Sequence, residues 1–207
     1  MSLPISYDAT SKKVKLLDDV KLSENRDLES EVEQLNTLVK DYINTNSDVP
    51  GLPTPQAFTK NLSLMVKKMH ASSTNLMRQK KFKDAAKQYS IALGLALARP
   101  KFENFQLTMS EVVICLMGRC DALMMEEDWL SAYQDAEILC QLAAAVADNH
   151  LRKGICELKL GNALDAKADF ERGLCFKPGH EKLKEHLKIV ERVIAEENGE
   201  SPSEATE

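Results

Sequence analysis

Basic and polar side chains recur at intervals of three and four residues in the first half of the chain. Lys67, His70, Thr74 and Arg78 follow this spacing, which places them on one face of a helix. Arg152 lies in a later segment that also has helical spacing. Because an arginine can hold a carboxylate through two parallel charge-assisted hydrogen bonds, these residues predict a surface that binds an acidic ligand. The alternative is that they are ordinary solvated charges on helix surfaces.

No residues have the spacing of a catalytic or metal site. The chain has no G-x-S-x-G, P-loop or H-E-x-x-H motif, and its 4 histidines are scattered. Its cysteines form no C-x2-C pair and no cluster with histidine at zinc spacing. We therefore expect a binding protein without cofactor or metal, and interpret the cysteines as small buried hydrophobes in a reducing compartment. They are Cys115, Cys120, Cys140, Cys156 and Cys175.

The composition excludes other classes of protein. Hydrophobic residues make up 43% of the chain, enough for a core, and a net charge of −5 argues against nucleic acid as the main partner. The first residues show no basic segment followed by an apolar one, and the longest apolar run is far shorter than a membrane span. We therefore expect a cytosolic protein, whose membrane association depends on a partner.

Residues 147–178 have the pattern of two helices joined by a tight turn. Gly154 and Ala166 are small residues at points where paired helices approach closely, and Phe170 follows one turn later to fill the gap. Pro178 ends the second helix because it cannot donate the next hydrogen bond.

The same pattern recurs twice upstream. Ala166 and Ala132 are 34 residues apart, and Ala132 and Ala85 are 47 residues apart. The first interval is the period of the tetratricopeptide repeat (TPR), and the chain resembles this family over residues 59–177. The longer interval predicts an insertion, for which the proline-led residues 99–105 are the candidate. The alternative is an unrelated helical bundle.

The resemblance implies an all-α fold, a three-repeat TPR helical array with a concave groove and a capping helix. Before it, alternating residues predict a short β-hairpin, followed by an amphipathic helix. We expect a docking segment over residues 1–44, a proline-containing linker over 45–58, the TPR domain over 59–197 and a disordered acidic tail over 198–207.

The amphipathic helix carries an apolar stripe without an evident partner in its own neighbourhood. The stripe either folds back on the first repeat or docks on another subunit. The residues assigned to docking are Leu28, Val32, Leu35, Val39 and Tyr42.

The first helices of TPR pairs line the groove, and here they resemble those of carboxylate-clamp TPR proteins. These bind chaperone tails ending in Glu-Glu-Val-Asp through a Lys and an Asn in repeat one, an Asn in repeat two, and a Lys and an Arg in repeat three. By this resemblance, His70 and Thr74 replace the first pair and Gly118 replaces the lone Asn. Asp148 and Arg152 stand for the last pair, in which only Arg152 keeps its identity. The predicted peptide-binding residues are Lys67, His70, Thr74, Asn75, Arg78, Arg152 and Lys159.

The layout of the whole chain is similar to the small cytosolic TPR subunits of the fungal post-translational Sec translocon at the endoplasmic reticulum. This resemblance implies a peripheral, non-enzymatic adaptor on the cytosolic face, without direct membrane insertion. Its groove would receive the acidic C-terminal tail of a DnaK-class chaperone, and its N-terminal segment would dock on membrane-anchored translocon subunits. Two alternatives stay open: a soluble cochaperone scaffold without a membrane partner, and a structural module whose groove binds no tail.

Overall fold

The computed structural model describes residues 4–18, 20, 26–44, 60–99, 103 and 105–199. The chain divides into two compact units, Met1–Thr54 and Pro55–Glu207, which are considered separately. The predicted linker at 45–58 lies outside the described residues, as does the tail beyond residue 199.

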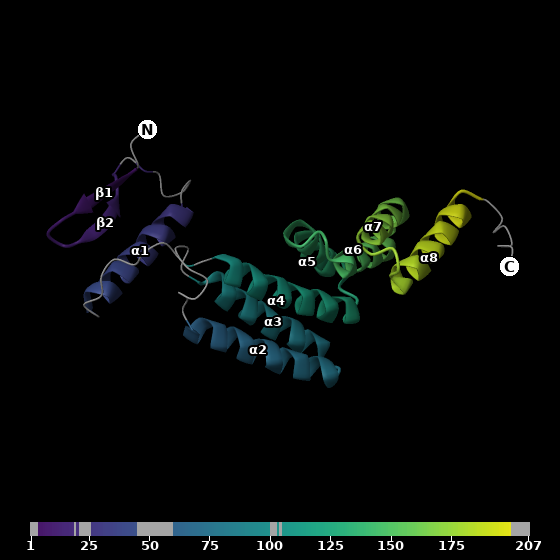
Figure 1. Ribbon diagram of the computed structural model, residues 1–207, viewed down its shortest axis with the longest axis horizontal. Coiled ribbons are helices and arrows are strands. Elements are labelled where there is room, and N and C mark those ends of the chain that lie inside the picture. Colours follow the sequence, from purple (N-terminus) through teal and green to yellow (C-terminus); the bar gives the residue numbers. More distant parts are fainter. Residues whose placement is uncertain are drawn as a thin grey trace. The chain divides into compact units, whose positions relative to one another are not determined.

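The N-terminal unit is a hairpin with one helix (Figure 1). Strands β1 (Ile5–Asp8) and β2 (Lys13–Leu16) pair in antiparallel orientation, and helix α1 (Arg26–Asn44) packs against β2. The side-chain amide of Asn36 accepts a hydrogen bond from the Val14 amide at 2.8 Å and donates one to the Val14 carbonyl at 2.9 Å. This amide thus satisfies the backbone N–H and C=O of Val14 at the edge of β2 that does not pair with β1. The predicted hairpin and helix are therefore confirmed.

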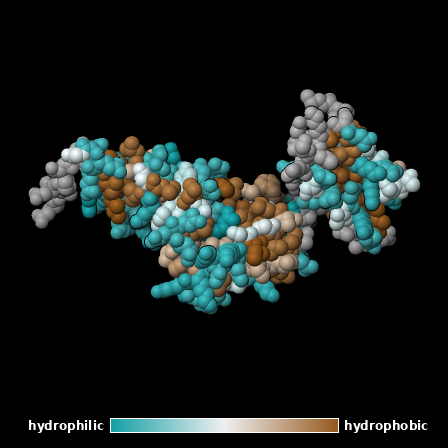
Figure 2. Space-filling model, turned by 180° about the vertical axis from the view of Figure 1, so that it is seen from behind, coloured by the Kyte–Doolittle hydropathy of each residue, from teal (hydrophilic) through white to brown (hydrophobic). Residues whose placement is uncertain are grey.

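The N-terminal unit has little interior of its own. Among its described residues, none is fully buried; Leu28, Val32 and Val39 are half-buried, and Leu35 is 37% exposed. Apolar side chains are visible on this unit at the right of Figure 2. The side chain of Tyr42 lies outside the described residues.

The second unit is a stack of antiparallel helices. Each helix packs on the next, and the first helices of successive pairs also touch each other, as the ribbon shows (Figure 1). This arrangement matches the predicted three helix pairs with a capping helix. The helices are α2 (Lys60–Arg78), α3 (Phe82–Leu97), α4 (Phe105–Met125), α5 (Trp129–Leu142), α6 (Ala147–Lys159), α7 (Ala163–Phe176) and α8 (Glu181–Glu197).

The turn inside each pair repeats the same backbone geometry. Lys80, Glu127 and Gly161 all have positive φ, of 59°, 60° and 86° respectively. These positions are 47 and 34 residues apart, and the same intervals separate the anchor alanines Ala85, Ala132 and Ala166. A residue in the left-handed region ends each first helix and allows the chain to turn back.

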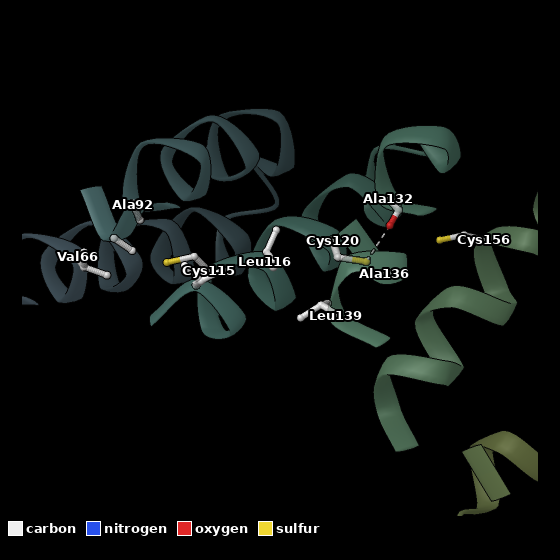
Figure 3. Packing of buried hydrophobic residues seen from close by; sticks show 11 residues of the cluster. Val66, Ala92, Cys115, Leu116, Cys120, Ala132, Ala136, Leu139 and Cys156 are labelled. Atoms are coloured by element: carbon white, nitrogen blue, oxygen red, sulfur yellow. Dashed lines mark hydrogen bonds between the residues drawn. The ribbon is translucent and has the colours of Figure 1, made fainter. Parts of the chain in front are cut away.

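Small residues and aromatic rings build the core, as predicted. The anchor alanines Ala132 and Ala166 are fully buried, and a Cβ added at Gly154 would overlap the ring of Phe170. Figure 3 shows the cluster around α4, where the Cys120 thiol donates to the Ala132 carbonyl at 3.4 Å.

The cysteines are not all part of this core. Cys115, Cys120 and Cys156 are fully buried, and burial, together with Glu111, raises the pKa of the Cys115 thiol to about 11. Cys140 is half-buried, and Cys175 is exposed, so the prediction of burial is wrong for Cys175.

The insertion between repeats one and two lengthens helices. Helix α4 has 21 residues and begins at Phe105, whereas α6 has 13 residues. The last residue of the candidate insertion, residues 99–105, is therefore already part of α4. Arg99 fastens the lengthened ends together: its guanidinium donates to Glu111 at 2.6 Å, Ser63 at 2.8 Å and Glu103 at 3.0 Å.

Candidate peptide-binding face

The predicted peptide-binding residues belong to α2 and α6, which with α4 are the first helices of the three pairs and form one face of the stack. We refer to it as the first-helix face. On α2, Lys67, Asn75 and Arg78 are exposed, whereas His70 and Thr74 are half-buried. Lys67 and Arg78 are 11 residues apart, close to three helical turns, so they share one side of α2.

In the first two repeats, the clamp-equivalent positions converge on Tyr89 of α3. The Thr74 hydroxyl donates to the His70 carbonyl at 3.0 Å and lies 3.3 Å from the Tyr89 hydroxyl. The His70 ring packs edge-on against the Tyr89 ring, with centroids 5.4 Å apart. Gly118 lies beneath the same ring, where an added Cβ would overlap it. Tyr89 therefore fills the space in which a longer side chain at position 118 would stand.

His70 adds no positive charge to this face at neutral pH. Burial lowers the pKa of its imidazole below the ordinary value of 6.5, because desolvation disfavours the charged form. Among the predicted peptide-binding residues of α2, the cations are therefore the exposed Lys67 and Arg78.

In the third repeat, Arg152 already holds a carboxylate. Its Nε donates to Asp121 Oδ1 at 2.7 Å and its Nη2 donates to Asp121 Oδ2 at 3.1 Å. Asp121 belongs to α4, so this bidentate pair joins the first helices of repeats two and three. Burial alone would lower the pKa of Arg152, but the pair with Asp121 raises it. Arg152 thus remains charged, and a carboxylate from within the chain occupies it.

Asp148, in the position of the clamp lysine, has its own partner. Its Oδ1 lies 3.1 Å from Nε2 of His180, the residue before α8. Burial would raise the pKa of Asp148, but the hydrogen bond from His180 and nearby cations lower it. Lys159, two turns after Arg152, lies with its Nζ 5.7 Å from the centre of the Trp129 ring.

A repeated pattern of ion pairs within the second and third helix pairs was not predicted. Arg119 of α4 forms a bidentate pair with Asp135 at 2.6 and 2.8 Å, and Lys153 of α6 contacts Asp169 at 3.0 Å. Both residues of the second pair lie 34 residues after their counterparts in the first. A basic residue and an aspartate repeating at this period are the signal that would have revealed these pairs.

A cleft of about 570 Å³ lies over the first of these pairs, between α3 and α5. Lys83 and Lys87 line one wall, and Glu126 and Asp128 line the other. The charges that line the cleft are balanced, and Asp135 engages Arg119.

The described part of the chain lacks two other kinds of feature. Within it, no helix has the length and apolar character needed to cross a membrane. Nor does any group of three or more His, Cys, Asp or Glu residues there have the geometry of a metal site.

Comparison with known proteins shows the family. No protein-family model matches the sequence. The translocation protein SEC72 of Saccharomyces cerevisiae is 32% identical over 197 residues, which cover 95% of this chain and 98% of that protein. This chain belongs to the SEC72 family. The ER protein translocation subcomplex subunit sec67 of Schizosaccharomyces pombe, another relative, is 32% identical over 105 residues, covering 51% of each chain.

Solved structures agree with the SEC72 family and with the TPR fold. A chain of the Sec complex from S. cerevisiae matches with a TM-score of 0.70 at 31% identity, covering 94% of this chain and 99% of that one. The second TPR domain of human RPAP3, solved with the HSP70 peptide SGPTIEEVD, matches with a TM-score of 0.53 at 16% identity. That match covers 63% of this chain and 98% of the RPAP3 chain. The predicted TPR array and the predicted family are thus confirmed.

Proposed function

We propose that this protein is a non-enzymatic adaptor of the endoplasmic-reticulum translocon that binds the acidic C-terminal tail of a DnaK-class chaperone. The observation that carries the proposal is that Arg152, on the first-helix face, holds a carboxylate through two parallel hydrogen bonds. The position matches the arginine of the carboxylate clamp, and a tail would present its terminal carboxylate or an acidic side chain to the same donors. Lys67 and Arg78 on α2 supply further positive charge for an acidic peptide.

The N-terminal unit supplies the other end of the adaptor. The apolar stripe of α1 is only half-buried against the hairpin, and this supports docking on a membrane-anchored translocon subunit. The SEC72 family and the matching chain in the Sec complex support the same assignment. The protein would then be a peripheral component on the cytosolic face, attached through its partner.

One observation favours a second candidate, a structural translocon subunit whose repeats bind no tail. Gly118 and Asp148 replace an asparagine and a lysine of the clamp, and Asp121 occupies the remaining arginine. In this candidate the Arg152–Asp121 pair would only join repeats two and three.

Peptide titration of the full chain distinguishes the two candidates. The probe is SGPTIEEVD, the HSP70 peptide of the RPAP3 structure, with a free or an amidated C-terminus. We expect the free acid to bind more tightly, and Arg152→Ala to weaken its binding by about 10- to 100-fold, as for loss of a charge-assisted contact. Arg192→Ala, which removes an exposed arginine of α8, is the matched control and should bind as wild type does. Equal affinity for acid and amide would remove the proposed function and leave the structural role.

A further inference from the structure

We infer that Asp121 is a built-in competitor for the tail: it occupies Arg152 in the free protein and must give way when a peptide carboxylate binds. This inference rests on the proposed function, and it names the residue that limits affinity and selects the ligand at the same site.

Hydrogen bonds engage all three nitrogens of the Arg152 guanidinium. Nε and Nη2 face Asp121, while Nη1 donates to the Asp148 carbonyl at 3.3 Å and lies 3.5 Å from Oδ1 of Asn149. An arginine has five N–H groups in a fixed planar fork, and its Nε/Nη2 edge, which Asp121 occupies here, can hold only one carboxylate in bidentate geometry at a time. A tail that uses this edge has to replace Asp121.

Burial indicates which of the two partners moves. The side chain of Arg152 is 15% exposed, whereas that of Asp121 is 44% exposed. The arginine is fixed between α4 and α6, and the aspartate can turn into solvent by a change of side-chain rotamer alone. Since an aspartate in water keeps its hydration, its release is far less costly than leaving a buried arginine unpaired.

Electrostatics makes the exchange selective. With Asp121 in place, an incoming carboxylate meets two acidic side chains, Asp121 and Asp148, around a single guanidinium. Because one carboxylate replaces another, the number of ion pairs at Arg152 does not change on binding. Net affinity must therefore come from the rest of the peptide, and we expect a preference for tails with several acidic residues that also reach the cations of α2.

The decisive experiment compares the affinities of full-length variants for free-acid SGPTIEEVD. Asp121→Asn keeps an oxygen acceptor for Arg152 but removes the competing charge. It should tighten binding by about tenfold, because Arg152 no longer has to be released from a charged partner before the peptide binds. Asp121→Glu retains the charge and should stay within about twofold of wild type. Asp84→Asn changes the net charge equally at an exposed position of α3 and should bind as wild type does.

The outcomes separate this inference from the proposed function. If wild type prefers the free acid over the amide but Asp121→Asn, with an unchanged melting temperature, binds no more tightly, the competitor role is wrong while tail binding stands. If acid and amide bind equally to wild type, the proposed function itself fails. Should Asp121→Asn melt early, the carboxylate ¹³C resonance of Asp121 in wild type decides: a shift on peptide addition supports release, and an unchanged resonance in the bound state refutes it.

Discussion

At the scale of single residues, Tyr89 explains why the clamp positions of the first two repeats differ from the family pattern. Its ring covers Gly118, and its hydroxyl lies beside Thr74, so the small residue at 118 and the tyrosine at 89 form one packed unit. The departure at Gly118 therefore has a steric cause. It does not by itself report on the ligand.

Gly118→Asn, which restores the residue of the clamp family, should destabilise the protein. Replacing glycine within a helix ordinarily gains a few tenths to about 1 kcal/mol, but overlap with a buried ring costs about 1 to 3 kcal/mol, so the net effect should be a loss. Urea denaturation followed by circular dichroism measures it. In the double variant with Tyr89→Ala the two losses should not add, since removing the ring makes room. Additive losses would mean that Tyr89 is not the obstacle.

A second residue-scale consequence concerns Glu157, which is almost fully buried on α6. Burial and the neighbouring carboxylate Asp169 raise its pKa to about 7, although Lys153 on its own helix opposes the shift. Asp169 and Asp165 face it from α7, and Glu137 of α5 shares Lys153. A buried acid with more acids than cations around it keeps its proton in the folded state up to about pH 7.

Glu157→Gln should therefore remove a pH dependence of stability. Because the folded pKa lies above the unfolded value of 4.5, the folded state binds more protons, and wild-type stability should fall as pH rises from about 4.5 to 7. Above pH 7 the glutamine variant should be more stable by about 1 to 3 kcal/mol, and near pH 4 the two should be equal. Denaturation curves at several pH values test this, with exposed Glu185→Gln as control. A parallel pH profile for Glu157→Gln and wild type would contradict it.

At the scale of elements, the sequence predicts those features of the helix pairs that follow from the repeat period and from the residues of the turns. The 34-residue spacing of Ala132 and Ala166 located two helix pairs in register, and the resulting helices bury these alanines completely. The additional turns of α4 could not be predicted in the same way. Arg99 followed by Pro100 signals a helix end. The contacts that stabilise the following turns are an ion pair from Arg99 to Glu111, 12 positions away, and a hydrogen bond to Ser63, 36 positions away. Such long-range pairs leave no periodic trace.

Arg99→Met should unfold or loosen the lengthened ends of α2 and α4. It leaves Glu111 buried without its cation, and breaking a buried pair from one side costs about 3 to 5 kcal/mol. The double variant Arg99→Met/Glu111→Met should recover much of this loss, since apolar side chains of similar size replace both charges. Hydrogen exchange at residues 60–66 and 105–112 should report the change locally. If the double variant is no more stable than the single one, the pair is not what holds these ends.

At the scale of the whole molecule, the candidate site shows a limit of prediction from sequence. Helical period places Arg152, Asp121 and Asp148 on the first helices, but a period does not tell which side chains pair across helices. The pairing of Arg152 with Asp121 depends on the separation of α4 and α6 and on their relative rotation, which packing of the whole repeat sets. The contacts of Tyr89 could not be predicted from the period either. Its ring extends from α3 and contacts residues of both α2 and α4.

The two units should differ in stability because they differ in interior. The repeat unit has fully buried cores, including Phe170, Leu139 and Leu183, whereas none of the described residues of the N-terminal unit is fully buried. In the isolated full chain, amides of α1 should therefore exchange at least about 100-fold faster than those of α6, since local stability follows buried apolar contacts. If the stripe of α1 is a docking surface, adding the partner translocon subunit should slow exchange in α1 and β2 and leave α6 unchanged. Equal protection of α1 and α6 without a partner would instead mean that the stripe is already covered within the chain, which favours the soluble scaffold over the translocon adaptor.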